Sequence, residues 1–403
     1  MYKFSSNVSE KEYEIFIKNF YNTPITQDYR WASVKNNWDN IVCGLYNKDK
    51  LIAAALILTK TTTFGIKIFY SPRGFLIDYK DKEILSKFTD EIKKYAKKEK
   101  AFLVKIDPMF SINEYSATKS EKNVPFNFSV DYEMKKENLL DNSYIHKGLK
   151  KEMNAYIQPR FNMMVPLVDS QNKFLSKEIL LKKLKKKNKN QIGDYHLSRG
   201  VFYEISSDEK DIDEFYRLLS YTEKRQNINL RDRNYFNRIL STYKGRAKMF
   251  FAKLDLDKYL EFIKKQHRVE SDYFKEKKQL IDEIRNDEGN IITVCTALVI
   301  LPVNEEGIRV MEYLYAGSNP DQFKSLNIPL GLVYRILEFG LENKCHYCNL
   351  GGVDGNLDDS LTTFKSKFNP MVVEFVGEFD LVINKFYYAL FDKILPKIKK
   401  IKR

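Results

Sequence analysis

The sequence contains little that would anchor the chain in a membrane. Its most apolar stretch, residues 51–58, has the length of a strand, far below the roughly 20 residues of a membrane-spanning helix. Residues 1–20 lack the apolar core and the cleavage site of a secretory signal. These absences predict a cytoplasmic protein, with at most a peripheral contact at the inner face of the membrane.

Cysteine and histidine are also scarce, with four residues of each among 403. In a cytoplasmic chain, so few cysteines indicate reduced thiols rather than a disulfide framework. The segment Cys345-His346-Tyr347-Cys348 offers three metal ligands, but strand alternation is expected to place Cys345 and Cys348 on opposite faces. The sequence therefore predicts structural thiols and no metal site.

Apolar and basic residues, by contrast, are plentiful. Hydrophobic residues make up 43% of the chain and aromatic residues 14%, which predicts a folded protein despite the 30% of charged residues. The formal charge of +14 attracts polyanions such as RNA, nucleotide-linked substrates or an anionic membrane face. General solubility explains the same charge, so charge alone selects no partner.

The hydrophobic periodicity repeats in the two halves of the chain. Each half predicts a helix, three strands, a second helix and a final strand. This order resembles an acetyltransferase (GNAT) unit, so the predicted fold is α/β (α+β) with two such units in tandem. The predicted elements are helix 13–20, strands 41–46, 51–59 and 66–71, helix 84–96 and strand 102–107 in the first half, and helix 212–219, strands 247–254, 291–301 and 308–316, helix 328–341 and strand 346–350 in the second.

Other segments interrupt or follow this repeat. Residues 112–160 predict a long connection with a short helix at 147–155, and residues 181–189 predict a basic helix before a strand at 201–205. A strand at 372–379 and a helix after it are expected to return to the first unit. The predicted domains are therefore 1–158 with 377–403, and 159–376 with a charged helical insertion at 255–290 that forms either one helix or a short hairpin arm.

Neither half has the glycine-rich loop with which acetyl-CoA enzymes of this fold hold the pyrophosphate. Pro108-Met-Phe110 follows the last strand of the first half, and the segment from Gly317 to Gly331 has only these two widely spaced glycines. The sequence therefore disfavours a CoA donor and predicts no cofactor, so an acyl group has to arrive on another carrier.

A series of short segments recurs in a recognisable order along the chain: Thr26–Lys35, Tyr70–Gly74, Val104–Pro108, Gln158–Asn162, Thr222–Gln226, Tyr313–Ser318, Leu350–Val353 and Leu361–Lys367. Their order and spacing resemble the FemABX aminoacyltransferases over nearly the whole length. The resemblance implies an enzyme that transfers an amino acid from aminoacyl-tRNA to an amine of the stem peptide of a UDP-linked or lipid-linked peptidoglycan precursor, and so helps to build the cell-wall cross-bridge.

The resemblance also implies residues that bind the precursor. Lys35 matches a precursor-binding lysine, and Arg231 with Tyr235 reproduces an Arg-x-x-x-Tyr pair; an arginine fork suits phosphate oxygens bidentately. Tyr315, or less so Tyr313, corresponds to a tyrosine beside the precursor. From the residues alone, Arg231 pairs equally well with a neighbouring acid, and one of the two tyrosines is expected in the core.

Further residues match the part of the site that faces the aminoacyl end of the tRNA. By resemblance, Lys365 stabilises charge on the ester and Phe364 stacks on the terminal adenosine. Asp107 matches a residue proposed as a base, although an aspartate before Pro108 also ends a strand through turn hydrogen bonds. No metal or covalent intermediate is expected, because the tRNA ester is already activated.

Two rival functions stay open at this point. One is a tRNA-dependent acyltransferase with a protein or lipid acceptor. The other is a non-catalytic protein that binds RNA or a membrane surface, which predicts salt-steep binding to any RNA and no acylation. The charged segment 255–290 is shorter than the coiled-coil arm of many FemABX members, which favours a short-armed or armless relative. The lysines at 181–189 contact tRNA phosphates or form a solvated helix face.

Overall fold

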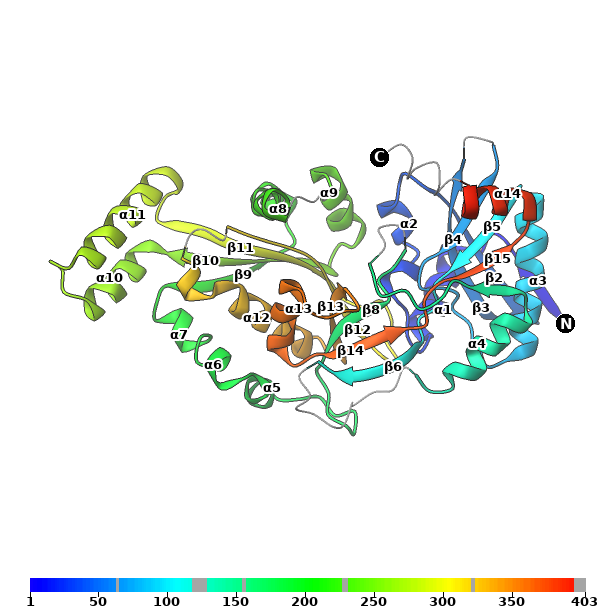
Figure 1. The fold of residues 1–403 in the computed structure, drawn as a ribbon, viewed down its shortest axis with the longest axis horizontal. Coiled ribbons are helices and arrows are strands. Elements are labelled where there is room, and N and C mark those ends of the chain that lie inside the picture. Colours follow the sequence, from blue (N-terminus) through cyan, green and yellow to red (C-terminus); the bar gives the residue numbers. More distant parts are fainter. Residues whose placement is uncertain (63–64, 118–128, 154–156, 227–230, 320–322, 395–403) are drawn as a thin grey trace.

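Two β-sheets organise the chain in the computed structural model, which describes residues 1–62, 65–117, 129–153, 157–226, 231–319 and 323–394 (Figure 1). The first sheet has the strand order β1-β2-β3-β4-β5-β15-β7, and the second β6-β14-β8-β13-β12-β11-β10-β9. The first contains β1 (Tyr2–Ser5), β2 (Asp39–Asn47), β3 (Lys50–Thr61), β4 (Lys67–Ser71), β5 (Ala101–Ile106), β15 (Phe379–Val382) and β7 (Tyr144–His146). The second contains β6 (Ser111–Ser116), β14 (Met371–Phe375), β8 (Phe161–Pro166), β13 (Tyr347–Val353), β12 (Val310–Ser318), β11 (Ile291–Ile300), β10 (Ala247–Asp255) and β9 (Val201–Ser206).

Helices connect the strands and cover the faces of both sheets. We call the first sheet with α1 to α4 and α14 the first unit, and the second sheet with α5 to α13 the second unit. The helices are α1 (Glu10–Asn19), α2 (Trp31–Val34), α3 (Lys82–Lys98), α4 (Tyr132–Asp141), α5 (Lys177–Lys183), α6 (Lys186–Lys189), α7 (Asp194–Leu197), α8 (Ile212–Gln226), α9 (Arg233–Thr242), α10 (Leu256–Gln266), α11 (Asp272–Glu288), α12 (Ile328–Glu342), α13 (Ser360–Lys365) and α14 (Lys385–Ala389). Single helical turns lie at Ile25–Gln27, Glu209–Asp211, Lys324–Leu326, Ser366–Phe368 and Leu390–Ile394.

The two sheets share one arrangement of four neighbouring strands. In the first sheet β2, β3 and β4 are antiparallel, and β5 then lies parallel to β4. Strands β10, β11, β12 and β13 repeat this pattern in the second sheet. Each parallel pair is joined by a helix, α3 or α12, because parallel neighbours need a crossover connection. The predicted α/β fold with two GNAT-like units in tandem is therefore confirmed.

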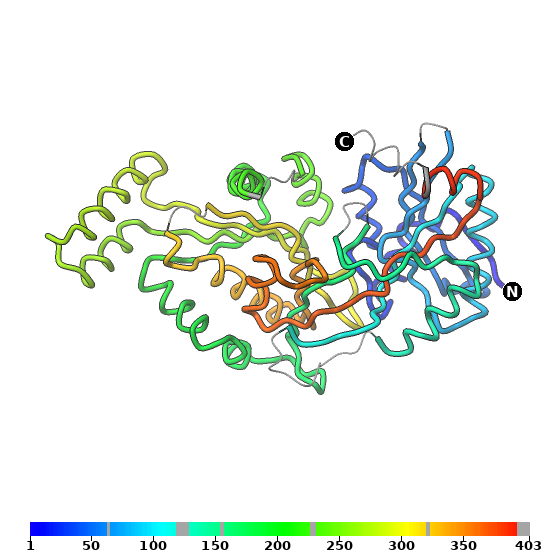
Figure 2. The backbone as a smooth tube through the Cα atoms, viewed as in Figure 1, coloured from blue at the N-terminus to red at the C-terminus, as the bar shows by residue number. Residues whose placement is uncertain are grey.

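Strands from distant segments complete each sheet. Strand β15 pairs with β5 in the first sheet, whereas β8 and β14 extend the second sheet beyond β13. Figure 2 shows this C-terminal segment, orange to red, passing from the second sheet to the first. Strand β6, which precedes residue 158, pairs with β14 in the second sheet. The domain boundaries 1–158 with 377–403 and 159–376 stay a prediction.

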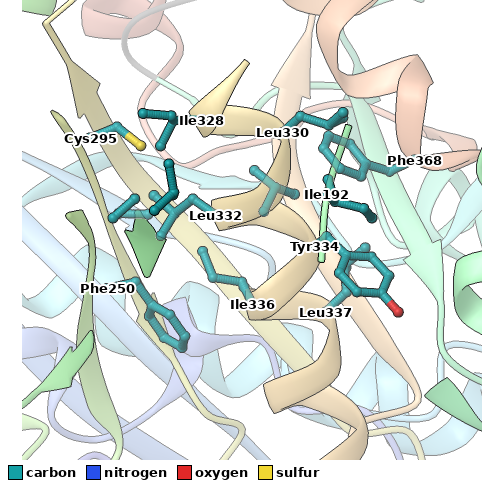
Figure 3. Packing of buried hydrophobic residues seen from close by; sticks show 14 of the residues in the cluster. Ile192, Phe250, Cys295, Ile328, Leu330, Leu332, Tyr334, Ile336, Leu337 and Phe368 are labelled. Atoms are coloured by element: carbon teal, nitrogen blue, oxygen red, sulfur yellow. The ribbon is translucent and has the colours of Figure 1, made fainter. Parts of the chain in front are cut away.

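The core of the second unit is built around α12. This helix is apolar on nearly all sides, which is typical of a helix enclosed by other elements. In Figure 3 the side chains of Ile328, Leu332 and Ile336 lie beside Phe250 and Cys295 of the neighbouring strands. We call the buried residues of this region the α12 core.

A second apolar cluster, the inter-unit core, joins the two units. It contains Trp31 and Leu56 of the first unit and Phe236 and Leu298 of the second, all buried. The fully buried carboxylate of Asp28 also accepts a hydrogen bond from Arg246 of the second unit at 2.5 Å. This shared packing holds residues of both units in a defined relative position.

The charged segment 255–290 forms a short hairpin arm of α10 and α11. Apolar residues of both helices, including Tyr259, Ile263, Phe274 and Ile281, pack into the α12 core. In Figure 1 the arm lies at the end of the molecule farthest from the first sheet. Of the two forms predicted for this segment, the structure shows the hairpin.

Two predictions for the connecting segments are wrong. Residues 147–153 are not helical, and the short helix is instead α4 at Tyr132–Asp141. Its inner face includes the polar Asn138, whose amide donates to the Tyr79 carbonyl at 2.9 Å, so the helix lacks a clear apolar period. The basic helix at 181–189 is two helices, α5 and α6, because the backbone is extended at Leu184 and Lys185.

The C-terminal prediction is also wrong in detail. The single strand expected at 372–379 is two strands, β14 and β15, which belong to different sheets. Gly377 between them has a φ of 92°, a conformation that glycine adopts without a steric penalty. The helix expected after it comprises α14 and a π-helical turn at Leu390–Ile394, and residues 395–403 lie outside the described residues.

Candidate active site

Four of the predicted substrate-binding residues meet where the two units face each other. The Lys35 Nζ lies 5.4 Å from the ring centroid of Tyr235, and the guanidinium of Arg231 lies 5.5 Å from the same centroid. The Tyr315 hydroxyl donates to the Tyr235 hydroxyl at 3.4 Å. Lys35 belongs to the first unit and the other three to the second. We call these four residues the interface cluster.

Short helices place these side chains. Helix α9 begins after Asp232, whose carboxylate accepts the backbone N–H of Tyr235 at 2.7 Å and so caps the helix. Lys35 follows α2, and its Nζ lies 4.9 Å from the ring of Trp31, which is buried in the inter-unit core. Both cations therefore contact aromatic rings that the inter-unit packing holds in place.

The interface cluster carries two positive charges that are not neutralised by an ion pair within the described residues. Burial, together with the charge of Arg231, lowers the pKa of Lys35 to about 8. Burial also raises the pKa of the Tyr235 phenol, so its hydroxyl stays protonated at neutral pH. A bound anion with several oxygens would relieve the repulsion between the cations, and a phosphate group has this chemistry.

Lys365 lies in a second place, at the end of β13. Helix α13 starts after Asp359, which caps the backbone N–H of Thr362 at 2.8 Å, and it ends at Lys365. The Lys365 Nζ donates to the Gly352 carbonyl at 2.9 Å, and the residue is only 6% exposed. A Cβ on neighbouring Gly351 would lie 3.7 Å from this Nζ. Glycine therefore leaves room in front of the ammonium group.

The chemistry of Lys365 follows from its burial. Desolvation lowers the pKa of its ammonium group to about 8, although the charge of Asp359 opposes the shift. An ammonium group has three N–H donors, and the Gly352 carbonyl occupies one of them. A protonated lysine in a site with little water is suited to stabilise an oxyanion.

Phe364 precedes Lys365 on the same helix and packs partly against the α12 core. Its ring meets Phe368 edge-on, with 5.7 Å between the centroids, and the Lys367 Nζ lies 5.3 Å from its centroid. Phe364 is half-buried, so part of its ring stays accessible. This arrangement can support the stacking of a base next to a cation.

Tyr313 and Tyr315 pack on different cores although they are two residues apart on β12. Leu298 pairs with Tyr315 and Val299 with Tyr313, so Leu314 is the extra residue of a β-bulge. Tyr313 packs against the α12 core, whereas Tyr315 packs against the inter-unit core. The bulge thus brings Tyr315, and not Tyr313, into the interface cluster.

Asp107 lies in a third place, directly after β5, and is buried. Its carboxylate accepts the Tyr70 hydroxyl at 2.7 Å and the backbone N–H groups of Arg73 and Gln158 at 2.6 and 3.0 Å. Burial raises the pKa of Asp107, and the charge of Arg73 opposes this shift. These donors engage both carboxylate oxygens, so Asp107 fastens the turn after β4 to the segment before β8.

Comparison with known proteins reveals the family. The model of the FemAB family matches residues 8–275 and 264–395. The chain belongs to the FemAB family. Proteins named lipid II:glycine glycyltransferase are similar: that of Staphylococcus haemolyticus is 26% identical over 441 aligned residues, and that of Staphylococcus saprophyticus 25% over 429, each covering 98% of this chain and 97% of the relative. The crystal structure of FemX matches with a TM-score of 0.78 and 23% identity over 97% of this chain and 100% of that chain, and so shares the fold.

Three polar residues that the sequence analysis did not single out connect these places in the FemAB chain. The buried Arg73 side chain donates to the Pro159 carbonyl at 2.5 Å. The Glu312 carboxylate on β12 accepts from the Asn349 amide at 2.9 Å, and the Asn349 side-chain oxygen accepts the backbone N–H of Gly351 at 2.9 Å. Asn349 therefore links Glu312 to the glycine next to Lys365.

Glu312 is a carboxylate within an otherwise apolar part of the second unit. Burial raises its pKa to about 7, although the charge of Arg73 and the hydrogen bond from Asn349 oppose the shift. A charged residue inside a predicted strand is a sequence signal for such a group. Arg73 had a weaker signal, because only its fold-dependent contacts set it apart from other arginines.

The cysteines of this FemAB chain are structural. Cys345 and Cys348 both lie in the α12 core, so the expectation of opposite faces is wrong: β13 begins at Tyr347, and Cys345 precedes it. Burial raises the pKa of Cys345 to about 12 and that of Cys348 well above its ordinary value. The described residues contain no group of three or more His, Cys, Asp or Glu side chains arranged for a metal. In the same part of the chain, no helix has both the length and the hydropathy for a membrane crossing.

Proposed function

We propose that this chain transfers an amino acid from aminoacyl-tRNA to an amine of the stem peptide of a lipid-linked peptidoglycan precursor, at the cytoplasmic face of the membrane. Membership of the FemAB family and the names of the staphylococcal relatives support this acceptor class. The observation that carries the proposal is the meeting of Lys35 and Arg231, one from each unit, at the ring of Tyr235.

The interface cluster is the proposed site for the diphosphate of the precursor. Arg231 offers a planar fork for two phosphate oxygens, and Lys35 adds a point charge. The hydroxyls of Tyr235 and Tyr315, which bond to each other at 3.4 Å, offer neutral donors beside them. Lipid-linked and UDP-linked precursors share a diphosphate, so the names of the relatives, rather than this cluster, favour the lipid-linked form.

The second place is the proposed site of the transfer. The amine nitrogen forms a bond to the ester carbonyl carbon, the carbon–oxygen bond to the terminal ribose breaks, and the proton lost by the amine ends on the ribose oxygen. Lys365 stabilises the oxyanion of the tetrahedral intermediate, and Phe364 stacks on the terminal adenosine. Orientation of the two substrates lowers the barrier further, because the ester is already activated.

Asp107 and Tyr313 receive positioning roles in this scheme. Asp107 holds the backbone of Arg73, whose side chain reaches the Pro159 carbonyl. A Cβ on Gly352 would approach the Pro159 ring to 2.4 Å, so this proline lies against the backbone that Lys365 binds. The Tyr313 carbonyl lies 3.8 Å from the position of a Cβ on Gly351, and so closes the other side of the glycine.

A mass-shift assay tests the proposal. The purified protein is incubated with a mixture of charged tRNAs and with a lipid-linked precursor, a UDP-linked precursor or a phosphate-free stem peptide. We expect the mass of one amino acid to be added to the lipid-linked precursor, and ribonuclease treatment of the tRNA to prevent it. Addition to the UDP-linked precursor alone would move the acceptor to the soluble class, and addition to none would overturn the proposal.

A further inference from the structure

A basic cavity lies on the far side of α13 from the α12 core. It has a volume of about 570 Å³ and is bordered by α6, by the turn Lys324–Leu326 and by α13 with the turn that follows it. This volume falls in the range of roughly 300–1,000 Å³ that is typical of ligand sites. Four lysines line it, and we call it the lysine pocket; they are Lys185, Lys187, Lys324 and Lys367.

The charge of the lysine pocket is not neutralised within the described residues. No aspartate or glutamate is among its described lining residues, and none of its four lysines forms an ion pair with a described residue. Burial and the nearby charge of Lys187 both lower the pKa of Lys367, which shows that two cations lie close together in a partly desolvated place. Such a cluster of like charges is unfavourable unless an anion binds between them.

One short helix borders both the lysine pocket and the proposed transfer site. Helix α13 and the turn after it carry Phe364 and Lys365, and the neighbouring Thr363, Ser366 and Lys367 line the lysine pocket. The Lys367 Nζ lies 5.3 Å from the ring centroid of Phe364. A ligand that stacks a base on Phe364 therefore meets the lysines with its adjoining backbone.

We propose that the lysine pocket binds backbone phosphates of the single-stranded 3′ end of the RNA donor. The proposal rests on the function proposed above and adds the place where the donor is held. Polar side chains beside the lysines, such as Gln191 and Thr363, offer contacts to ribose hydroxyls. A concave pocket next to Phe364 fits a flexible strand better than a membrane surface, which would need a flat basic face.

The test is a double variant, Lys187→Met with Lys324→Met, which leaves Phe364, Lys365 and Lys367 in place. The matched control is Lys87→Met with Lys97→Met; both residues are exposed on α3, at the opposite end of the molecule (Figure 1). The probes are an uncharged RNA hairpin with a four-nucleotide single-stranded 3′ end, the same hairpin with a blunt end, and vesicles of anionic lipid. Binding is measured as a function of salt concentration.

For the hairpin with the single-stranded end, we expect the slope of log affinity against log salt to fall by about two in the lysine-pocket variant, one for each lost phosphate contact. The advantage of the single-stranded end over the blunt end should also fall. In the transfer assay, KM for the charged RNA should rise while KM for the precursor stays unchanged. The control variant should behave as the wild type.

Each other outcome has a distinct meaning. Equal slopes in the wild type and the lysine-pocket variant would overturn the assignment of the pocket, even if the wild type transfers amino acids. Loss of vesicle binding with unchanged RNA binding would overturn it in favour of a lipid headgroup. Absence of transfer by the wild type would contradict the proposed function instead, and the hairpin measurements would still decide whether the pocket holds RNA.

Discussion

Replacement of Lys365 by methionine is expected to abolish transfer while the protein stays folded. Methionine keeps most of the length and the apolar stem of lysine but removes the ammonium group. If Lys365 stabilises the oxyanion, the rate of transfer should fall by roughly 10²- to 10³-fold, the usual effect of losing one oxyanion donor. That loss corresponds to about 2.7–4 kcal/mol of activation free energy.

The effect on stability should be small because two changes oppose each other. The variant loses the hydrogen bond from Nζ to the Gly352 carbonyl at 2.9 Å, and a bond from a charged group contributes about 1.5–3 kcal/mol. It also loses the burial that lowers the pKa of Lys365 from 10.5 to about 8, a penalty of about 3 kcal/mol at 1.36 kcal/mol per pKa unit. The free energy of unfolding should therefore change by no more than about 2 kcal/mol.

The assay is the single-turnover rate of transfer with both substrates saturating, together with urea unfolding of the same preparation. Lys275→Met is the matched control, since Lys275 is an exposed lysine on α11 of the arm. A folded Lys365→Met variant with the wild-type rate would refute the role of the ammonium group. An equal loss of rate in the control would show that the assay reports general charge rather than this site.

Three further predictions concern the other places of the site. Because Lys35 has a pKa of about 8, its positive charge is lost as the pH rises through 8; the Kd of the precursor should rise there, Lys35→Arg should remove this rise, and a flat wild-type profile would contradict it. Asp107→Asn should lower the free energy of unfolding by about 1–3 kcal/mol in urea, because its amide N–H would face N–H donors; unchanged stability with a lost rate would instead favour a base. Glu312 has a folded-state pKa of about 7 against 4.5, so it is protonated only in the folded state between these pH values, and its contribution to stability declines as pH rises through them; Glu312→Gln should gain up to about 3 kcal/mol over the wild type between pH 4.5 and 8, and a pH-independent difference would reject the shift.

The tandem fold could be predicted because its elements have clear hydrophobic periods. Strands such as β3 and helices such as α3 bury one continuous set of apolar residues, and the order of elements repeats in the two halves. The helix α4 was missed because its buried face includes Asn138, whose role is a hydrogen bond to a distant turn. Polar residues that pack by long-range hydrogen bonds give no local period.

The candidate site could be predicted only in part, for the same reason. Lys35, Arg231 and Tyr235 lie in segments that resemble a family, and the structure brings them together. Arg73 and Glu312 acquire their character from partners that lie far away in the sequence. No local pattern predicts these contacts, because they depend on how the two units pack.

The bulge on β12 explains how one strand can serve both substrates. A regular strand would point Tyr313 and Tyr315 to the same face, whereas the extra residue Leu314 directs them to different cores. Tyr315 then joins the interface cluster, and the Tyr313 carbonyl lies 3.8 Å from the Cβ position of Gly351, which itself lies 3.7 Å from the Lys365 Nζ. Since residues two apart on a strand are separated by roughly 7 Å, the proposed phosphate site and transfer site are held about one stem-peptide segment apart. The inter-unit core fixes this separation, so the acceptor amine reaches the ester only when the phosphates of the precursor are bound on the other side of the strand.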